Sequence, residues 1–157
     1  MHELGHAIIR YKTGTSKENI RISLVPRGDA LGLTISASEA SRLLETPQHL
    51  EDNIMACLGG RAAEELEFGP TCISSGCSDD LERATQLAAV FSANCGMGNS
   101  LRVRDTNDPS VLSEVDTLLS ECYKRAKQIL SDNKDLIERG KKLLENQAEL
   151  SGTELFN

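Results

Sequence analysis

The chain has 157 residues, and its 24 Asp and Glu against 17 Lys and Arg give a formal net charge of −7. A chain of this length buries about 70% of its unfolded surface, which supports one hydrophobic core and not two. The acidic balance and the 3% aromatic content argue against a nucleic-acid-binding face, which needs basic patches or stacking rings. Since no run approaches the roughly 18 apolar residues of a membrane span, we expect one soluble, mainly helical domain over residues 1–157 with no direct membrane insertion.

The N-terminal third of the chain predicts a short helix followed by a β-hairpin. Apolar residues at three- and four-residue spacing over 2–13 indicate the helix. Apolar and polar residues then alternate over 20–24 and again over 31–35, on either side of a turn, which predicts two antiparallel strands. Pro26 places the first of these strands at a sheet edge or at its own end.

A second helix is predicted to begin at Thr46 and Pro47, which are typical of an N-cap and a first helical residue, and to continue through Leu66. Gly59 and Gly60 lie inside this helix, where each glycine costs about 1 kcal/mol relative to alanine. We therefore expect close packing against another backbone at this pair.

The C-terminal part predicts three more helices. Ser78 is a suitable N-cap for a helix over 78–96, whose first turn is acidic. Residues 97–107 are polar and without pattern, which indicates a mobile connection. Asp108 opens a long amphipathic helix, and 135–147 forms another, either antiparallel to it or continuing it with a bend.

The five cysteines are an odd number, and none forms a pair separated by two residues. We expect reduced thiols, with Cys57 and Cys122 as small core residues because they lie within apolar helical patterns.

The strongest chemical signal is the motif His-Glu-x-x-His at residues 2–6. Residues four apart share one face of a helix, so His2 and His6 can bind one metal ion together. Glu3 lies beside them, in position to reach a metal-bound water. Zinc would lower the pKa of that water and polarise a scissile carbonyl, while Glu3 takes the proton and later delivers it to the leaving amine.

A catalytic zinc needs a third protein ligand, and spacing alone does not choose it. Glu64 has alternative roles as the partner that orients a histidine or as an ion pair with Arg61. For Asp79 and Glu82, at the start of the third predicted helix, the alternative role is to compensate the dipole of that helix. The candidates are His49, Glu64, Glu65, Asp79, Asp80 and Glu82.

Four motifs occur in an order that resembles the peptidase domain of FtsH-type ATP-dependent zinc metalloproteases. They are His-Glu-Leu-Gly-His-Ala at 2–7, Val-Pro-Arg-Gly with Ala-Leu-Gly-Leu-Thr at 25–34, Leu-Gly-Gly-Arg-Ala-Ala-Glu-Glu-Leu at 58–66, and Ser-Asp-Asp-Leu-Glu-Arg-Ala-Thr at 78–85. The resemblance covers residues 1–97 clearly and extends more loosely to about 155. It implies a mainly α fold with a small β-hairpin or sheet, in which 1–97 carry the metal site and 108–150 form C-terminal helices.

The same resemblance implies a zinc site made by His2, His6 and Asp80, with Glu3 as the general base. Asp80 matches the aspartate that is the family's third ligand, and Asp79 stands where the family usually has asparagine. The hairpin strand from Leu31 to Ser36 is our candidate for pairing with an extended substrate, since an exposed strand edge binds any backbone. The contacts expected on it are Leu31, Gly32, Leu33 and Thr34, and the alternative is a hairpin with a structural role alone.

Family membership implies an endopeptidase that cuts unfolded polypeptides in protein quality control, fed by an AAA ATPase and assembled as a homo-oligomer, a hexamer in the parent enzyme. The parent is expected to be membrane-anchored, with its protease facing the cytoplasm or an organelle matrix or stroma. This chain has no Gly-x-x-x-x-Gly-Lys-Ser/Thr phosphate loop, so we expect the ATPase and transmembrane parts to be absent from it. The alternative is a weakly active or inactive relative that serves as a helical binding or oligomerisation module.

Overall fold

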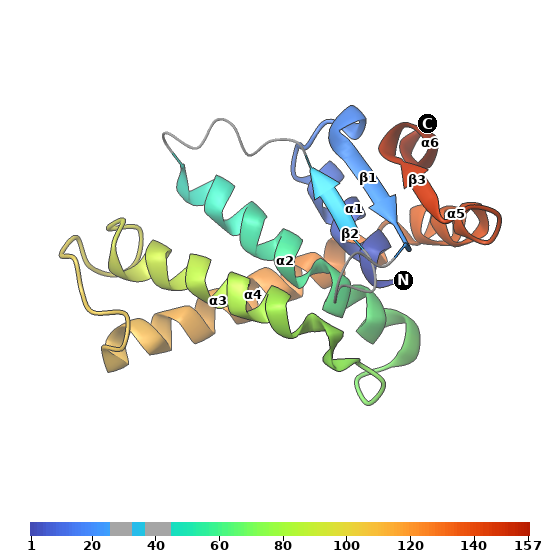
Figure 1. The fold of residues 1–157 in the computed structure, drawn as a ribbon. Helices are drawn as coiled ribbons and strands as arrows, with labels where there is room; N and C mark the ends of the chain where they lie inside the picture. The colour runs from blue at the N-terminus through green and yellow to red at the C-terminus, as the bar shows by residue number, and fades with distance from the viewer. Residues whose placement is uncertain (26–32, 37–44) are drawn as a thin grey trace.

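The computed structural model describes residues 1–25, 33–36 and 45–157. Helices dominate these residues, and three short strands form one sheet (Figure 1). In chain order the elements are α1 (His2–Lys12), β1 (Ile20–Ser23), β2 (Leu33–Ser36), α2 (Pro47–Phe68), α3 (Ser78–Ala93), α4 (Pro109–Ser131), α5 (Lys134–Leu144), β3 (Glu149–Ser151) and α6 (Gly152–Phe156), with 3₁₀ turns at Lys17–Asn19 and Ser75–Cys77. The expected fold class, mainly α with a small β element, is confirmed.

The main core lies between α1, α2, α3 and α4, with α2, α3 and α4 extending together away from the sheet (Figure 1). It is aliphatic and rich in alanine, and small side chains allow the helix backbones to approach closely. The long α4 shows the pattern that the sequence predicts, because its buried residues recur at intervals of four and seven positions, which places them on one stripe. They are Val111, Val115, Cys122, Ala126 and Leu130.

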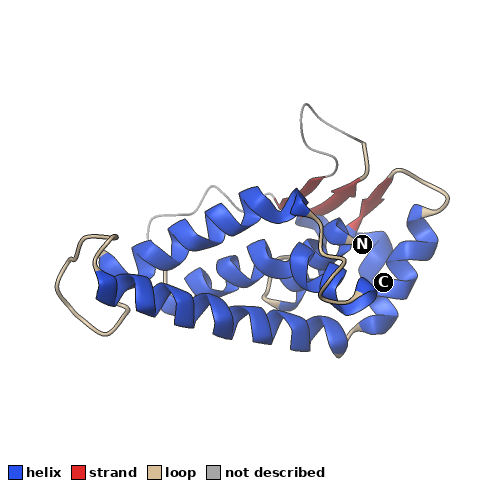
Figure 2. Cartoon of the chain, turned by 90° about the horizontal axis from the view of Figure 1, so that it is seen from below, coloured by secondary structure: helices blue, strands red, loops and turns tan. Residues whose placement is uncertain are grey.

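A second, smaller core joins the sheet to α1, α5 and α6. The strand order is β2-β1-β3, with both neighbours antiparallel to β1, so β1 is the central strand. The sheet lies at one edge of the helical body (Figure 2). The buried residues of this core are Leu4, Ala7, Ile20, Ile22, Leu150 and Leu155. Because α1 contributes to both cores, its position is fixed from two sides.

Two of the three predicted N-cap residues are confirmed in detail. The Thr46 side chain accepts a hydrogen bond from the backbone N–H of His49, and Asp108 accepts one from Ser110. The prediction for α3 is wrong by one residue, because Cys77 is the N-cap and Ser78 is already helical. The 3₁₀ turn that precedes α3 shifts its start, since it already gives Cys77 a turn-like backbone.

The C-terminal region holds elements that the sequence analysis missed. β3 pairs with β1 in the register Arg21 to Ser151 and Ser23 to Glu149. Ser151 then caps α6 through a capping box with Glu154, a Ser-x-x-Glu signature that the sequence displays. Helix α5 lies beside α6 rather than back along α4 (Figure 1), so the antiparallel alternative for the last two long helices is wrong.

The connection between α3 and α4 contains no helix or strand, as predicted, but it is anchored. The guanidinium of Arg104 donates to both carboxylate oxygens of Glu114, at 2.8 and 2.9 Å, and to the carbonyl of Ser92 at 2.8 Å. This bidentate pair fastens the connection to both helices. All five cysteines are free, and Cys57 and Cys122 are buried as expected. Among the helices of the described ranges, none has the length and apolar content needed to cross a membrane.

Candidate metal centre

The predicted metal ligands meet where the start of α1, the second half of α2 and the first turn of α3 converge (Figure 1). His2 and His6 lie one turn apart on α1 with their ring centroids 4.6 Å apart. Asp80 comes from α3, 78 residues along the chain from His2, and reaches the same point. The structure thus brings together the three residues that the family resemblance implies.

The three candidate ligand atoms form a compact triangle. The Nε2 atoms of His2 and His6 are 2.9 Å apart, and Oδ2 of Asp80 lies 3.0 Å from the first and 3.1 Å from the second. A tetrahedral zinc site with metal–ligand distances of about 2.0–2.1 Å spaces its ligand atoms about 3.3 Å apart. The residues therefore fit zinc after an expansion of a few tenths of an ångström.

The Nδ1 atom of each imidazole, on the side away from the triangle, makes a hydrogen bond that orients the ring so that Nε2 faces the triangle. Nδ1 of His6 lies 2.7 Å from the carbonyl oxygen of Ala56, and Nδ1 of His2 lies 2.9 Å from Oε1 of Glu64. Both partners are acceptors, so each Nδ1 carries a proton, and a ring in its neutral form presents an Nε2 lone pair to the triangle. When both rings are neutral, two nitrogen lone pairs and a carboxylate oxygen converge, an arrangement that repels itself unless a proton on an Nε2 or a metal cation lies among them.

The electrostatics of the site favour the charged forms of its members. Burial acts to raise the pKa of Asp80, but hydrogen bonds from His2 and His6 outweigh it and hold this pKa well below its usual range. Burial likewise acts to lower the pKa of His2, yet hydrogen bonds to Asp80 and Glu64 raise it overall. Asp80 is therefore ionised at neutral pH, which is the form that a metal requires of a carboxylate ligand.

Glu64 is held as a partner of His2. Its Oε2 accepts a hydrogen bond of 2.8 Å from the backbone N–H of Ser74, and its Oε1 accepts one of 3.1 Å from the Ser74 hydroxyl. Burial acts to raise the pKa of Glu64, but the bonds from Ser74 and His2 lower it overall. Of the two alternatives for Glu64, the structure favours the partner that orients a histidine.

Sequence reasoning missed two groups of this site. Ser74 lies in a loop of serine, glycine and cysteine whose pattern gives no spacing to either histidine. The Ala56 carbonyl is a backbone group, so no side-chain pattern could have identified it. The Ala56 contact arises from the packing of α1 on α2, and the Ser74 contact joins the loop after α2 to Glu64 on that helix.

The other candidate ligands have different partners. His49 is exposed on the first turn of α2 and lies 3.9 Å from Glu45. Glu65 accepts hydrogen bonds from Tyr123 and from Lys127. Asp79 is exposed and accepts from Ser78, and Glu82 accepts from Gln86. None of these belongs to the triangle. Glu3, the predicted general base, is half-buried in the first turn of α1, between the two histidines in sequence.

Of the four predicted substrate-contacting residues, Leu31 and Gly32 lie outside the described residues. Leu33 and Thr34 belong to β2, where they pair with Ser23 and Ile22 of β1. Because the strand order is β2-β1-β3, β2 is an edge of the described sheet. Within residues 1–25, 33–36 and 45–157, the side of β2 that faces away from β1 pairs with no other strand.

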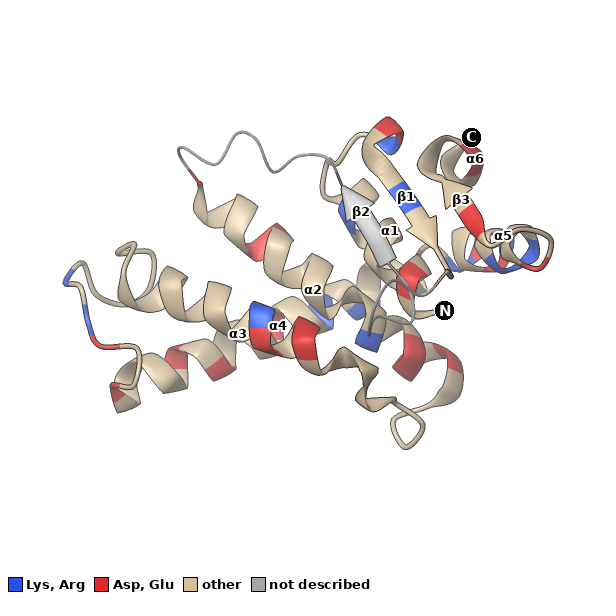
Figure 3. Ribbon diagram, in the orientation of Figure 1, with Lys and Arg blue, Asp and Glu red and all other residues tan. Residues whose placement is uncertain are grey.

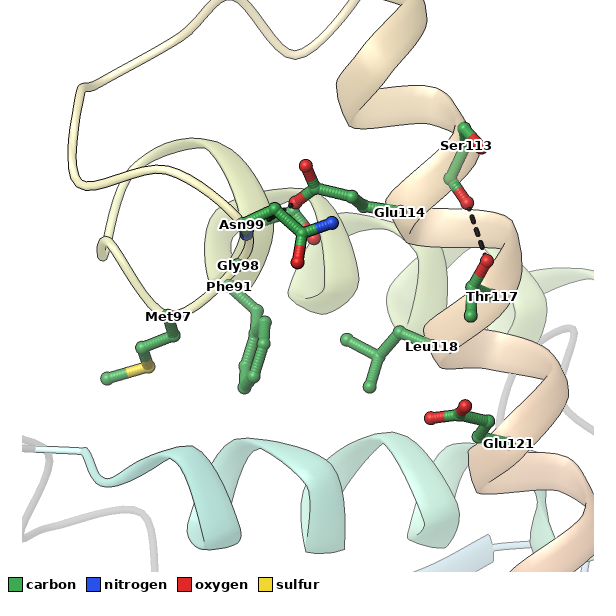
Figure 4. Close-up of a pocket in the computed structure, with 10 residues that line it drawn as sticks. Phe91, Met97, Gly98, Asn99, Ser113, Glu114, Thr117, Leu118 and Glu121 are labelled. Carbon is green, nitrogen blue, oxygen red and sulfur yellow. Dashed lines mark hydrogen bonds between the residues drawn. The ribbon is translucent and has the colours of Figure 1, made fainter.

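Acidic residues mark the end of α2 and the start of α3 that surround the centre (Figure 3). A separate pocket of about 250 Å³ lies between α3, α4 and the residues that follow α3 (Figure 4). Phe91 and Leu118 form its apolar floor, and Glu114 and Glu121 border it. It contains none of the predicted ligands or Glu3, so it is distinct from the metal centre.

Comparisons with known proteins identify the family of the chain. A family model described as peptidase family M41 matches residues 1–155. The chain is similar to the ATP-dependent zinc metalloprotease FtsH of Bacillus subtilis, with 32% identity over 160 residues that cover 87% of this chain and 25% of the relative. It is also similar to FtsH of Thermotoga maritima, with 31% identity over 98% of this chain and 29% of the relative. The ATP-dependent zinc metalloprotease YME1L of Drosophila melanogaster is 37% identical over 82% of this chain and 20% of the relative. The chain thus spans roughly a quarter of the length of these curated relatives.

Proposed function

Because the chain belongs to peptidase family M41, we propose that it is the zinc-dependent endopeptidase domain of an ATP-dependent protease, with His2, His6 and Asp80 as zinc ligands and Glu3 as general base. The observation that carries the proposal is the convergence of three acceptor atoms within 3.1 Å of one another, with the far edge of each imidazole held by an acceptor. Such a donor set, with nitrogen and carboxylate oxygen ligands on rigid helices, suits zinc.

The chain's own groups divide the work of hydrolysis. Zinc, when bound, would lower the pKa of a bound water and polarise the scissile carbonyl. The hydrogen bonds that the two imidazoles donate to the Ala56 carbonyl and to Glu64 keep the rings oriented. Glu3 takes the proton of the attacking water at its carboxylate and delivers it to the leaving amine nitrogen.

This function is tested directly on the purified 157-residue chain. We expect about one equivalent of zinc per chain and slow hydrolysis of denatured casein, lost on chelation and restored by zinc. Failure to bind zinc at micromolar concentrations would contradict the proposal.

Glu64 tunes this proposed site through His2, so Glu64→Gln should weaken zinc affinity about 10–100-fold. The amide can still accept the proton of Nδ1, but it is neutral and its NH₂ group opposes the donors of Ser74. Competition with a chromophoric chelator measures the change. Glu65→Gln is the matched control, because Glu65 pairs with Tyr123 and Lys127, and it should leave zinc affinity unchanged. Equal effects of the two variants would refute this role of Glu64.

We assign substrate binding to the edge strand β2. An extended, unfolded polypeptide can pair with the main chain of an edge without being selected by its side chains, which suits a protease that acts on many sequences. The proposed contacts are Leu31, Gly32, Leu33 and Thr34, as in the sequence analysis, with the last two at the start of β2.

Proline substitutions in β2 test this assignment, since successive residues of a strand direct their N–H groups to opposite edges. Of Thr34→Pro and Ile35→Pro, one should remove a ladder bond to β1 and lower the melting temperature. The other should preserve the ladder and raise KM for denatured casein about tenfold or more. Thermal melts identify which variant is which. A stable variant with an unchanged KM would exclude β2 as the binding edge.

The relatives are named ATP-dependent zinc metalloproteases, which supports an ATPase partner for the parent enzyme. We propose that an AAA ATPase threads unfolded polypeptides to this site within a homo-oligomer, a hexamer in the parent enzyme. The parent is proposed to be membrane-anchored, with this domain on the cytoplasmic, matrix or stromal side.

A further inference from the structure

One face of α2 lies directly against the two histidines. Ala56, Gly60 and Glu64 are four residues apart, so they occupy three successive turns on the same face of the helix. Ala56 holds the ring of His6 and Glu64 holds the ring of His2. Gly60 is the residue between these two anchors, and it has no side chain.

Position 60 requires glycine because the imidazoles of His2 and His6 occupy the space where a side chain would lie. A Cβ built at Gly60 would lie 2.5 Å from Cε1 of His2 and 2.6 Å from Nε2 of His6, and it would also overlap Nε2 of His2. Real Cβ atoms do not approach other heavy atoms to less than 3.0 Å. Any residue other than glycine at position 60 therefore displaces both rings.

Neither ring can rotate away from a new side chain at position 60 without losing a hydrogen bond. A terminal side-chain atom can often rotate away from a new neighbour, but here each imidazole is fixed by its opposite nitrogen. His6 would lose its 2.7 Å bond to the Ala56 carbonyl, and His2 its 2.9 Å bond to Glu64. Each lost bond would leave an imidazole N–H without its acceptor, and an unpaired donor away from water costs more than the bond itself stabilises.

The adjacent glycine serves a different purpose. A Cβ at Gly59 would lie 2.9 Å from the carbonyl oxygen of Gly5, so this residue allows the backbones of α1 and α2 to cross. The cost of two glycines within a helix predicts backbone packing at both positions. The structure agrees for Gly59, but the nearest atoms to Gly60 belong to side chains.

We propose that Gly60 is a positioning residue of the metal centre, which sets the distance and orientation of His2 and His6 by admitting their rings against the backbone of α2. The expected effect on zinc affinity rests on the proposed function. The positioning of the two rings rests on the contact geometry alone. Gly60 acts through the histidines and touches neither substrate nor the reacting water.

The first test measures zinc and cobalt binding to Gly60→Ala. We expect the zinc Kd to weaken by more than about 100-fold, the upper end of the loss from removing an outer hydrogen-bond partner. The visible spectrum of the cobalt-loaded protein should lose its tetrahedral signature. A Gly60→Ala variant with wild-type affinity and spectrum would overturn the proposal.

The second test uses metal-free protein and separates positioning from general packing. Gly60→Ala should lower the melting temperature of the otherwise wild-type chain but raise it in a His2→Ala/His6→Ala background, where alanine favours the helix and meets no rings. Gly59→Ala should lower the melting temperature in both backgrounds, since its contact is with the Gly5 backbone. An equal effect of Gly60→Ala in the two backgrounds would refute the inference. If the wild-type chain binds no zinc, the proposed function fails, while this cycle still decides the role of Gly60.

Discussion

Replacing Glu3 with glutamine should reduce hydrolysis of denatured casein by at least about 10²-fold while leaving one zinc bound per chain. Glutamine has nearly the same shape as glutamate but cannot take a proton, and general acid–base catalysis contributes about 10²–10⁴-fold. Because Glu3 lies in α1 between the two proposed ligands without belonging to the triangle, its loss removes a proton carrier and not a ligand. Peptidase assays and metal analysis on the same preparation measure both quantities.

Glu82→Gln is the control for this substitution, since Glu82 lies on α3 and bonds only to Gln86 among the contacts described for it. Its activity should equal that of the wild type. Undiminished cleavage by Glu3→Gln would disprove the assigned mechanism. Zinc binding by a wild-type chain that cuts no unfolded substrate would instead favour a binding or oligomerisation module.

Replacing Asp80 with alanine should weaken zinc affinity by more than the about 10–100-fold expected for Glu64→Gln, because it removes a ligand rather than the partner of one. The carboxylate of Asp80 lies 3.0 and 3.1 Å from the two Nε2 atoms and is held in its ionised form by them. Without it, two imidazoles alone remain to bind the ion. Chelator competition and equilibrium dialysis with zinc give the affinities.

Asp79→Ala is the matched control, because Asp79 precedes Asp80 in the same turn but is exposed and accepts from Ser78. Its zinc affinity should be that of the wild type. If Asp80→Ala retains zinc while Glu64→Gln loses it, Glu64 is the third ligand and the assignment made here is wrong. Equal losses in Asp79→Ala and Asp80→Ala would point to disruption of α3 instead.

Much of the fold followed from local patterns. The apolar spacing of α1 and α4 and the caps at Thr46 and Asp108 are properties of neighbouring residues, so they could be predicted without knowing what the helices contact. The strand β3 could not be predicted in this way. It has three residues, and its pairing with β1 joins positions more than 120 residues apart, which no local alternation indicates.

The start of α3 shows that a suitable capping residue does not by itself determine where a helix begins. Ser78 has the right chemistry for a cap, but the 3₁₀ turn at Ser75–Cys77 gives that position to Cys77. The glycine pair of α2 shows a similar limit. The cost of glycine in a helix indicated close packing, but not that Gly59 faces a backbone and Gly60 faces two histidines.

By itself the sequence determined the half of the candidate metal centre that lies within one helix. The four-residue spacing of His2 and His6 fixes their common face through the geometry of the α-helix, and Glu3 accompanies them. Among six candidates for the third ligand, spacing could not choose, and the family resemblance supplied Asp80. Only the tertiary structure placed Asp80 against both imidazoles, Glu64 and Ala56 behind them and Gly60 beneath them. Those contacts join residues 50 to 78 positions apart, and they exist because the packing of α1 on α2 and α3 brings the helices together.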